Sequence, residues 1–146
     1  MMKQLKSYIL AATLVVVGTL SLSAAPSAQA SYRGTVLYSE LGNVDLAVAK
    51  WYYELSLIYN NSTYRYYTYL NANRAYSDAY NAYRQAPSGS TAKRYAGYAL
   101  NNASSYRRYA YSNYIYGGRY TSYKYQVARY GYLAQYYLSW AGYYAA

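Results

Sequence analysis

The chain has 146 residues, a formal net charge of +10, 29 tyrosines and no phenylalanine, histidine or cysteine. The lack of histidine and cysteine excludes imidazole bases, thiolate nucleophiles, disulfides and Cys/His metal centres. The four carboxylates, Glu40, Asp45, Glu54 and Asp78, are scattered along the sequence and form no convincing acid–base pair. We therefore expect a protein that is not an enzyme and that uses no metal or cofactor.

The first thirty residues have the pattern of a bacterial signal peptide. Lys3 and Lys6 precede an almost wholly apolar stretch at 8–22, and the small residues Ala28 and Ala30 fit the signal-peptidase rule. We expect cleavage after Ala30, which leaves 116 residues and places the protein in the periplasm, on the cell surface or outside the cell. The sequence after residue 30 has no stretch long and apolar enough to cross a bilayer, so no transmembrane segment is expected after cleavage.

The remaining chain is predicted to hold an N-terminal tail at 31–40 and a single tyrosine-rich helical domain at 41–146. The main reversal is expected at 85–91, because this segment combines Pro87 and Gly89 with two good helix N-cap residues, Ser90 and Thr91. Two weaker interruptions, Asn60-Asn61-Ser62 and Gly117-Gly118, can be read either as turns or as kinks.

A seven-residue repeat predicts that the domain is helical. Apolar or aromatic residues occupy 26 of 30 positions spaced alternately by three and four, against 55% hydrophobic residues in the whole chain. Many of these positions alternate Tyr with Ala, as in Tyr69, Ala72, Tyr76 and Ala79. The pattern predicts an all-α fold with coiled-coil-like Tyr/Ala seams: an antiparallel helical hairpin, or an up-down four-helix bundle if both weak interruptions are turns.

Two other interpretations compete with the helical one. Repeated Tyr-x-Tyr pairs and Gly117-Gly118 would suit tyrosine-rich β-hairpins, and the low-complexity composition would suit a partly disordered chain. Helix is favoured because six tyrosines from Tyr109 to Tyr144 recur every seven residues without a change of phase.

A second set of tyrosines predicts an interaction surface. Between residues 109 and 144, helical spacing places six tyrosines on the face opposite the heptad set. These are Tyr111, Tyr114, Tyr125, Tyr132, Tyr136 and Tyr143. A small bundle has only one interior, so we expect this second set to face solvent or a partner, most simply another copy of the chain.

The chain is free of acids after Asp78, and its cations there alternate with tyrosines. Six of these cations are candidate contacts to anionic partners: Arg94, Arg107, Arg108, Arg119, Lys124 and Arg129. The pattern indicates a secreted structural or adhesive protein that self-associates through tyrosines and contacts anionic envelope polymers. Two alternatives remain: a basic aromatic module that binds extracellular nucleic acid or polysaccharide, and a phenol-based redox or dityrosine cross-linking protein.

Overall fold

The computed structural model describes residues 27–146, which form four α-helices and no β-strand. The helices are α2 (Ser27–Tyr59), α3 (Ser62–Gln85), α4 (Thr91–Ile115) and α5 (Thr121–Ala145). The all-α prediction is confirmed, and the β-hairpin alternative is wrong. The predicted signal peptide lies outside the described residues except for positions 27–30, whose backbone begins α2.

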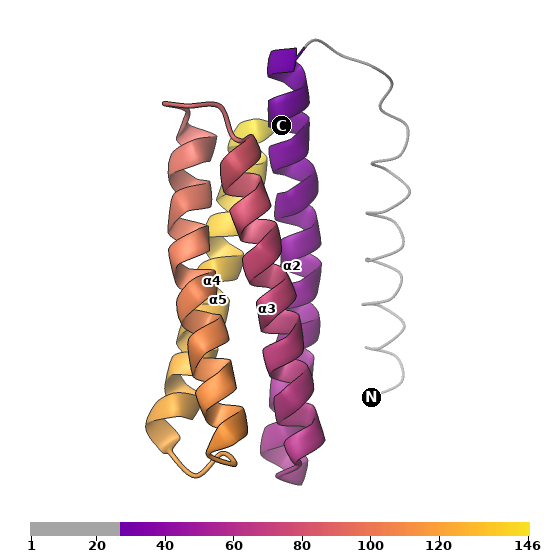
Figure 1. Cartoon of the computed structure of the whole chain (residues 1–146), viewed down its shortest axis with the longest axis vertical. Coiled ribbons are helices and arrows are strands. Elements are labelled where there is room, and N and C mark those ends of the chain that lie inside the picture. The colour runs from indigo at the N-terminus through magenta and orange to yellow at the C-terminus, as the bar shows by residue number, and fades with distance from the viewer. Residues whose placement is uncertain (1–26) are drawn as a thin grey trace.

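The four helices run alternately up and down along one long axis (Figure 1). Helix α2 packs against α3 and α5, and α4 also packs against α3 and α5, whereas α3 and α5 barely touch. The α3–α4 connection and the C-terminus lie at one end of the bundle, and the α2–α3 and α4–α5 turns lie at the other (Figure 1). This is the arrangement of an antiparallel four-helix bundle.

The expected reversal at 85–91 is present, because α3 ends at Gln85 and α4 begins at Thr91. Gly89 has a positive φ of 75°, and the Ser90 side chain caps α4 by accepting a hydrogen bond of 3.0 Å from the Lys93 amide. The backbone therefore stops one helix and starts the next within five residues.

Both weaker interruptions are turns. Asn60 separates α2 from α3 with a left-handed φ of 48°, and the Asn61 side chain caps α3 through the amide of Thr63. At the end of α4, the Gly118 amide donates to the Asn113 carbonyl, and Gly117 has a φ of 64°. This is a Schellman ending, and the positive φ explains why glycine stands there.

The core is built mainly from small residues. Along each helix, buried positions recur at spacings of three and four, and most of them are Ala, Gly, Ser or Thr. In α3 and α4 they include Thr68, Ala72, Ala75, Ala79, Ala82, Ala92, Ala96, Ala99, Ala103 and Ala110. Short side chains let neighbouring helices approach closely, so the bundle gains its packing from backbone proximity rather than from bulky residues.

The predicted Tyr/Ala seam is correct in its alanines and wrong in most of its tyrosines. The seven-residue repeat placed Tyr95, Tyr109 and Tyr137 inside the bundle, but each of them is half-buried. The buried residue is instead the next one along the chain, as with Ala96 after Tyr95. One residue of an α-helix turns about 100°, which moves these rings from the interior to the boundary between helices. There the ring covers the small-residue core while the hydroxyl reaches water, which explains the use of Tyr rather than Phe.

The segment 31–40 is helical and packed, which corrects the expectation of an N-terminal tail. Thr35 and Ser39 are buried, and Tyr32 and Val36 pack against a small apolar cluster at the end of the bundle. The prediction failed because buried Thr and Ser do not register as apolar residues in a hydrophobic pattern.

Candidate interaction surface

Four of the six predicted surface tyrosines form a line along α5. Tyr125, Tyr132 and Tyr143 are 63%, 67% and 70% exposed, and Tyr136 between them is 44% exposed. Their spacings of seven, four and seven keep them on one helical face. We refer to Tyr125, Tyr132, Tyr136 and Tyr143 as the α5 aromatic face.

Ring contacts hold part of this face in place. Tyr132 and Tyr136 stack with their centroids 6.4 Å apart, and Trp140 lies edge-on to Tyr143 at 5.5 Å. Tyr136 also touches Trp140, so a continuous row of aromatic rings runs along the second half of α5. Pre-ordered rings lose little conformational entropy when they are covered by a partner.

The other two predicted tyrosines lie elsewhere. Residues 109–144 are not one helix, because the turn at 116–120 reverses the chain, and Tyr111 and Tyr114 therefore belong to α4. Tyr111 lies 5.2 Å from the ring of Tyr69, and Tyr114 lies 5.5 Å from the ring of Tyr66, both on α3. These two rings cover the α3–α4 boundary rather than extend the α5 aromatic face.

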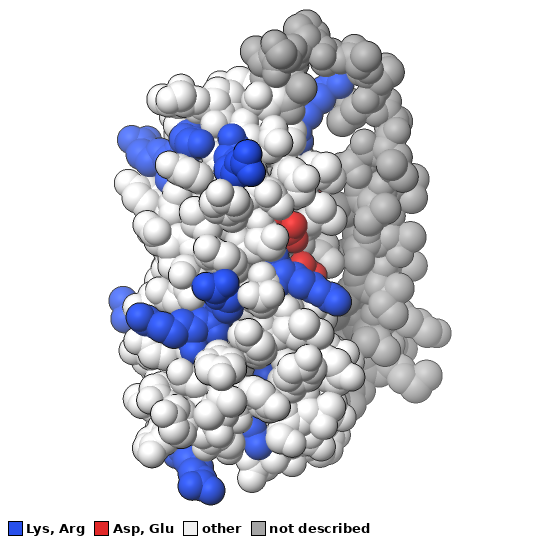
Figure 2. Space-filling view, in the orientation of Figure 1, with Lys and Arg blue, Asp and Glu red and all other residues white. Residues whose placement is uncertain are grey.

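The six predicted basic residues are spread over α4, α5 and the turn that joins them. Arg94, Arg108 and Arg129 each lie 5.0–5.9 Å from the ring of the tyrosine that follows them in the sequence. Figure 2 shows Lys and Arg spread from one end of the visible face to the other, while the acidic side chains on that face gather at one place beside α3. This face of the described chain therefore presents cations over a wide area.

Arg107 has the closest interhelical ring contact of the six. Its guanidinium lies 4.0 Å from the centroid of Tyr76 on α3, so a cation–π contact joins α4 to α3. The remaining two predicted residues, Arg119 and Lys124, lie at the α4–α5 turn beside Arg65 of α3. Arg65 occupies one of the four positions at which the three-and-four spacing holds no apolar or aromatic residue, yet it is 7% exposed.

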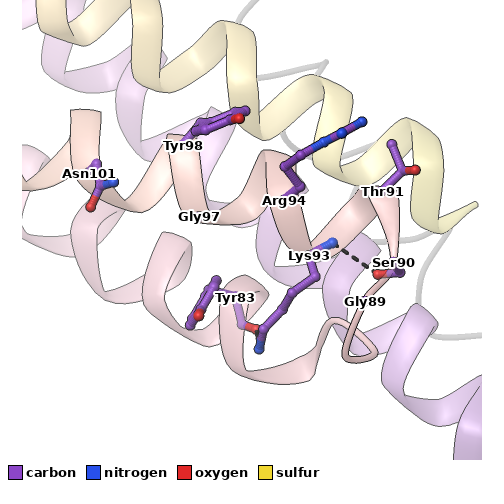
Figure 3. A pocket seen from close by; sticks show the side chains of 9 residues that line it. All are labelled: Tyr83, Gly89, Ser90, Thr91, Lys93, Arg94, Gly97, Tyr98 and Asn101. Atoms are coloured by element: carbon purple, nitrogen blue, oxygen red, sulfur yellow. Dashed lines mark hydrogen bonds between the residues drawn. The ribbon is translucent and has the colours of Figure 1, made fainter.

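A groove with both rings and cations lies near the start of α4 (Figure 3). It has a volume of about 410 Å³, with Tyr83 of α3 and Tyr98 of α4 among its walls. Lys93 donates to the Tyr83 carbonyl, and its ammonium lies 3.8 Å from the centroid of the Tyr83 ring. Gly97 and Arg94 also line the groove, so a ligand there would meet aromatic faces and positive charge together.

The acidic residues have their own arrangement. Asp45 of α2 and Asp78 of α3 share a hydrogen bond between their carboxyl groups. Burial, followed by the nearby Asp45 carboxylate, raises the pKa of Asp78 to about 7. Burial also raises the pKa of Asp45, against the opposing effects of its hydrogen bond to Asp78 and the charge of Arg74. The pair connects α2 to α3.

Within residues 27–146, no three His, Cys, Asp or Glu side chains gather into a candidate metal site. None of the helices in that range combines the length and the apolar character needed to span a bilayer. No protein-family model, curated protein or solved structure matches the chain.

Proposed function

We propose that this chain is an exported, non-enzymatic structural or adhesive protein. Its molecules associate through the α5 aromatic face, and its Arg and Lys side chains contact anionic material at the cell surface. The observation that carries the proposal is the alignment of Tyr125, Tyr132 and Tyr143, each about two-thirds exposed, on one face of a helix. A row of exposed rings of this kind is characteristic of an interaction surface.

A second copy of α5 suits this face by its sequence. If two α5 helices pair antiparallel about a twofold axis near Ala134, Tyr125 of one copy lies at the level of Tyr143 in the other. Tyr132 then lies level with Tyr136, and the small exposed residue Ala128 lies level with Trp140. Aromatic rings therefore meet aromatic rings along the middle of this contact, where offset-stacked and edge-to-face pairs are favourable.

Charge also permits this pairing. The only charged residues of α5 are Lys124 and Arg129. In the antiparallel register Arg129 lies level with Ser139, and Lys124 lies level with Tyr144, so neither cation meets its own counterpart. The two copies of Arg129 are ten residues of helix apart, about 15 Å along the axis, so the cations of the two chains do not face each other directly.

Self-association is tested by sedimentation velocity of the chain from Ser31, as cleavage after Ala30 would leave it. The triple substitution Tyr132→Ser, Tyr136→Ser and Tyr143→Ser is expected to convert oligomer to monomer. Replacing three exposed tyrosines on other helices, Tyr59, Tyr66 and Tyr80, is the matched control and should leave the mass unchanged. A wild-type chain that sediments as a monomer at all concentrations would overturn the proposal.

The groove beside Tyr83 and Tyr98 favours a second candidate, a binding module for acidic polysaccharide. Sugar rings stack on aromatic side chains, and Lys93 and Arg94 would pair with carboxylates along such a polymer. Binding of an acidic polysaccharide that is lost in Tyr98→Ala, and retained in Tyr59→Ala, would support this candidate. Equal binding by both variants would count against it.

A further inference from the structure

A second cavity lies at the opposite end of the bundle from the groove in Figure 3, between the α2–α3 and α4–α5 turns. It has a volume of about 260 Å³. Its charged lining residues are Arg65 from the first turn of α3, Arg119 from the α4–α5 turn and Lys124 from the first turn of α5. No carboxylate lines it, so three positive charges meet in one place without an acid among them.

Arg65 is the unusual member of this group. It is 7% exposed, and within residues 27–146 no ion pair joins this buried guanidinium to a carboxylate. Its Nη1 donates to the Asn60 side-chain oxygen at 3.1 Å, but its buried Nε has no hydrogen-bond acceptor. A buried charge without a counter-charge is costly, which indicates that the arrangement serves a ligand rather than stability.

The second unsatisfied group in the cavity is Asn113. This residue is 2% exposed, and its side-chain oxygen has no hydrogen-bond donor. Both the Arg65 and the Asn113 side chains line the same space and each has a buried polar atom without a partner. A polar ligand that accepts a hydrogen bond from Arg65, and that donates one to Asn113 through a hydroxyl group or a bound water, would satisfy both side chains.

The cations are held close to one point. A Cβ placed on Gly118 would lie 3.5 Å from Arg65 Nη1 and 3.6 Å from Lys124 Cε, so the two side chains converge on the turn. The Lys124 backbone is fixed in turn, because the buried Tyr53 hydroxyl donates to its carbonyl at 2.7 Å. Arg65 and Lys124, from two different helices, are thus positioned beside the turn that carries Arg119 before any ligand arrives.

From these contacts we propose that the cavity binds a phosphate group, either free or as part of a phosphate ester. A planar carboxylate is satisfied by one arginine fork, whereas three cations from three directions suit a tetrahedral anion with several oxygens and a double charge. The volume equals that of about nine waters at roughly 30 Å³ each, enough for a phosphate with a small substituent. The inference rests on the anion-contacting part of the proposed function and is independent of the α5 aromatic face.

Isothermal titration calorimetry at fixed ionic strength, on the chain from Ser31, tests this site. Inorganic phosphate, glycerol 3-phosphate and a glycerol phosphodiester are the probes, and acetate is the planar comparison. Phosphate is expected to bind and acetate to bind far more weakly. Tight binding by the diester would identify a polymer backbone as the source, and tight binding by inorganic phosphate alone would identify the free ion. Acetate that binds as well as every phosphate probe, or no heat from any phosphate probe, would overturn the proposal.

Two substitutions locate the site. Arg65→Met and Lys124→Met are each expected to weaken phosphate binding by about tenfold or more, because each removes a charge-assisted hydrogen bond. Arg129→Met removes one exposed cation from the same helix and is the matched control, which should change affinity by less than about twofold. Arg65→Met should also melt at a higher temperature than wild type without phosphate, since it removes an uncompensated buried charge. Equal affinities for wild type, Arg65→Met and Lys124→Met would refute the site.

The phosphate site and self-association can fail separately. The triple tyrosine variant on α5 should bind phosphate with wild-type affinity, and Arg65→Met should sediment like wild type. Phosphate binding lost with the α5 tyrosines instead of with Arg65 would contradict the inference while leaving the self-association proposal standing.

Discussion

The ring of Tyr106 lies directly on the backbone of Gly131, so that a Cβ at position 131 would stand 3.1 Å from the ring's Cε2 atom. Tyr106 is one of two buried tyrosines in the described chain, and its ring occupies the space that the missing side chain leaves. This pairing joins α4 to α5 and shows how the bundle admits a large ring: a glycine must stand opposite it.

Adding a methyl group at this contact should destabilise the protein. In Gly131→Ala the buried ring has little room to yield, and overpacking of this kind costs about 1–3 kcal/mol, partly offset by about 1 kcal/mol from the better helix propensity of alanine. Gly97→Ala is the matched control, because its Cβ would meet Tyr83 at an ordinary 3.5 Å. Urea unfolding should therefore show Gly97→Ala to be more stable than Gly131→Ala, and the reverse order would contradict the packing described here.

The small-residue core can be tested at two adjacent positions of α3. Ala79 is fully buried and Tyr80 is 45% exposed. Ala79→Leu should lower the free energy of unfolding by about 1–3 kcal/mol or more, since closely packed helices must separate to admit the larger side chain. Tyr80→Leu should change it by less than about 0.5 kcal/mol. Similar losses for both would mean that the helix is rotated relative to the structure.

The sequence predicted the helices and the position of the main reversal because a seven-residue repeat and a Pro/Gly connection report directly on backbone geometry. It misplaced the seam by one residue at Tyr95, Tyr109 and Tyr137, because hydrophobic patterns count a half-buried ring and a buried alanine alike. The tyrosine surface was predicted as if residues 109–144 formed one helix, because the sequence left open whether Gly117-Gly118 is a turn or a kink. Arg65 was not predicted as a site residue, because a single cation among apolar helix positions looks like an interruption of the helix until its neighbours in the structure are known.

The carboxyl pair should make stability depend on pH. Asp78 has a folded pKa of about 7 against an ordinary value of 3.8, so the folded state holds its proton more tightly than the unfolded chain does. The stability that this proton provides is fully present below pH ~4 and is lost as the pH rises through about 7. The loss should be about 1 kcal/mol, because the half-exposed group is screened by solvent. Asp78→Asn should flatten the dependence in melts across this range, whereas Glu54→Gln should not. A wild-type chain whose melting temperature is the same at pH ~4 as above pH 7 would refute this prediction.

The contact between Arg107 and Tyr76 predicts a specific coupling between α4 and α3. Arg107→Gln should lower the free energy of unfolding by about 0.5–2 kcal/mol, because the guanidinium at 4.0 Å lies over a partly desolvated ring. Arg108→Gln provides the comparison, since Arg108 contacts Tyr109 of its own helix at 5.0 Å. A double-mutant cycle with Tyr76→Leu measures the pair directly, and a coupling energy of zero would show that the contact contributes nothing.

The proposed α5 contact between two copies is tested most directly by a distance between spin labels. The chain has no cysteine, so Ala128→Cys places a single label beside the α5 aromatic face, and Asn73→Cys places one on the exposed side of α3. Antiparallel pairing about Ala134 separates the two copies of residue 128 by twelve residues of helix, which with the spacing between helices gives about 20 Å between backbones. Double electron–electron resonance should show a narrow distribution near that value for Ala128→Cys and none for Asn73→Cys. The absence of any short distance at position 128, at concentrations well above those of the sedimentation experiment, would contradict the account.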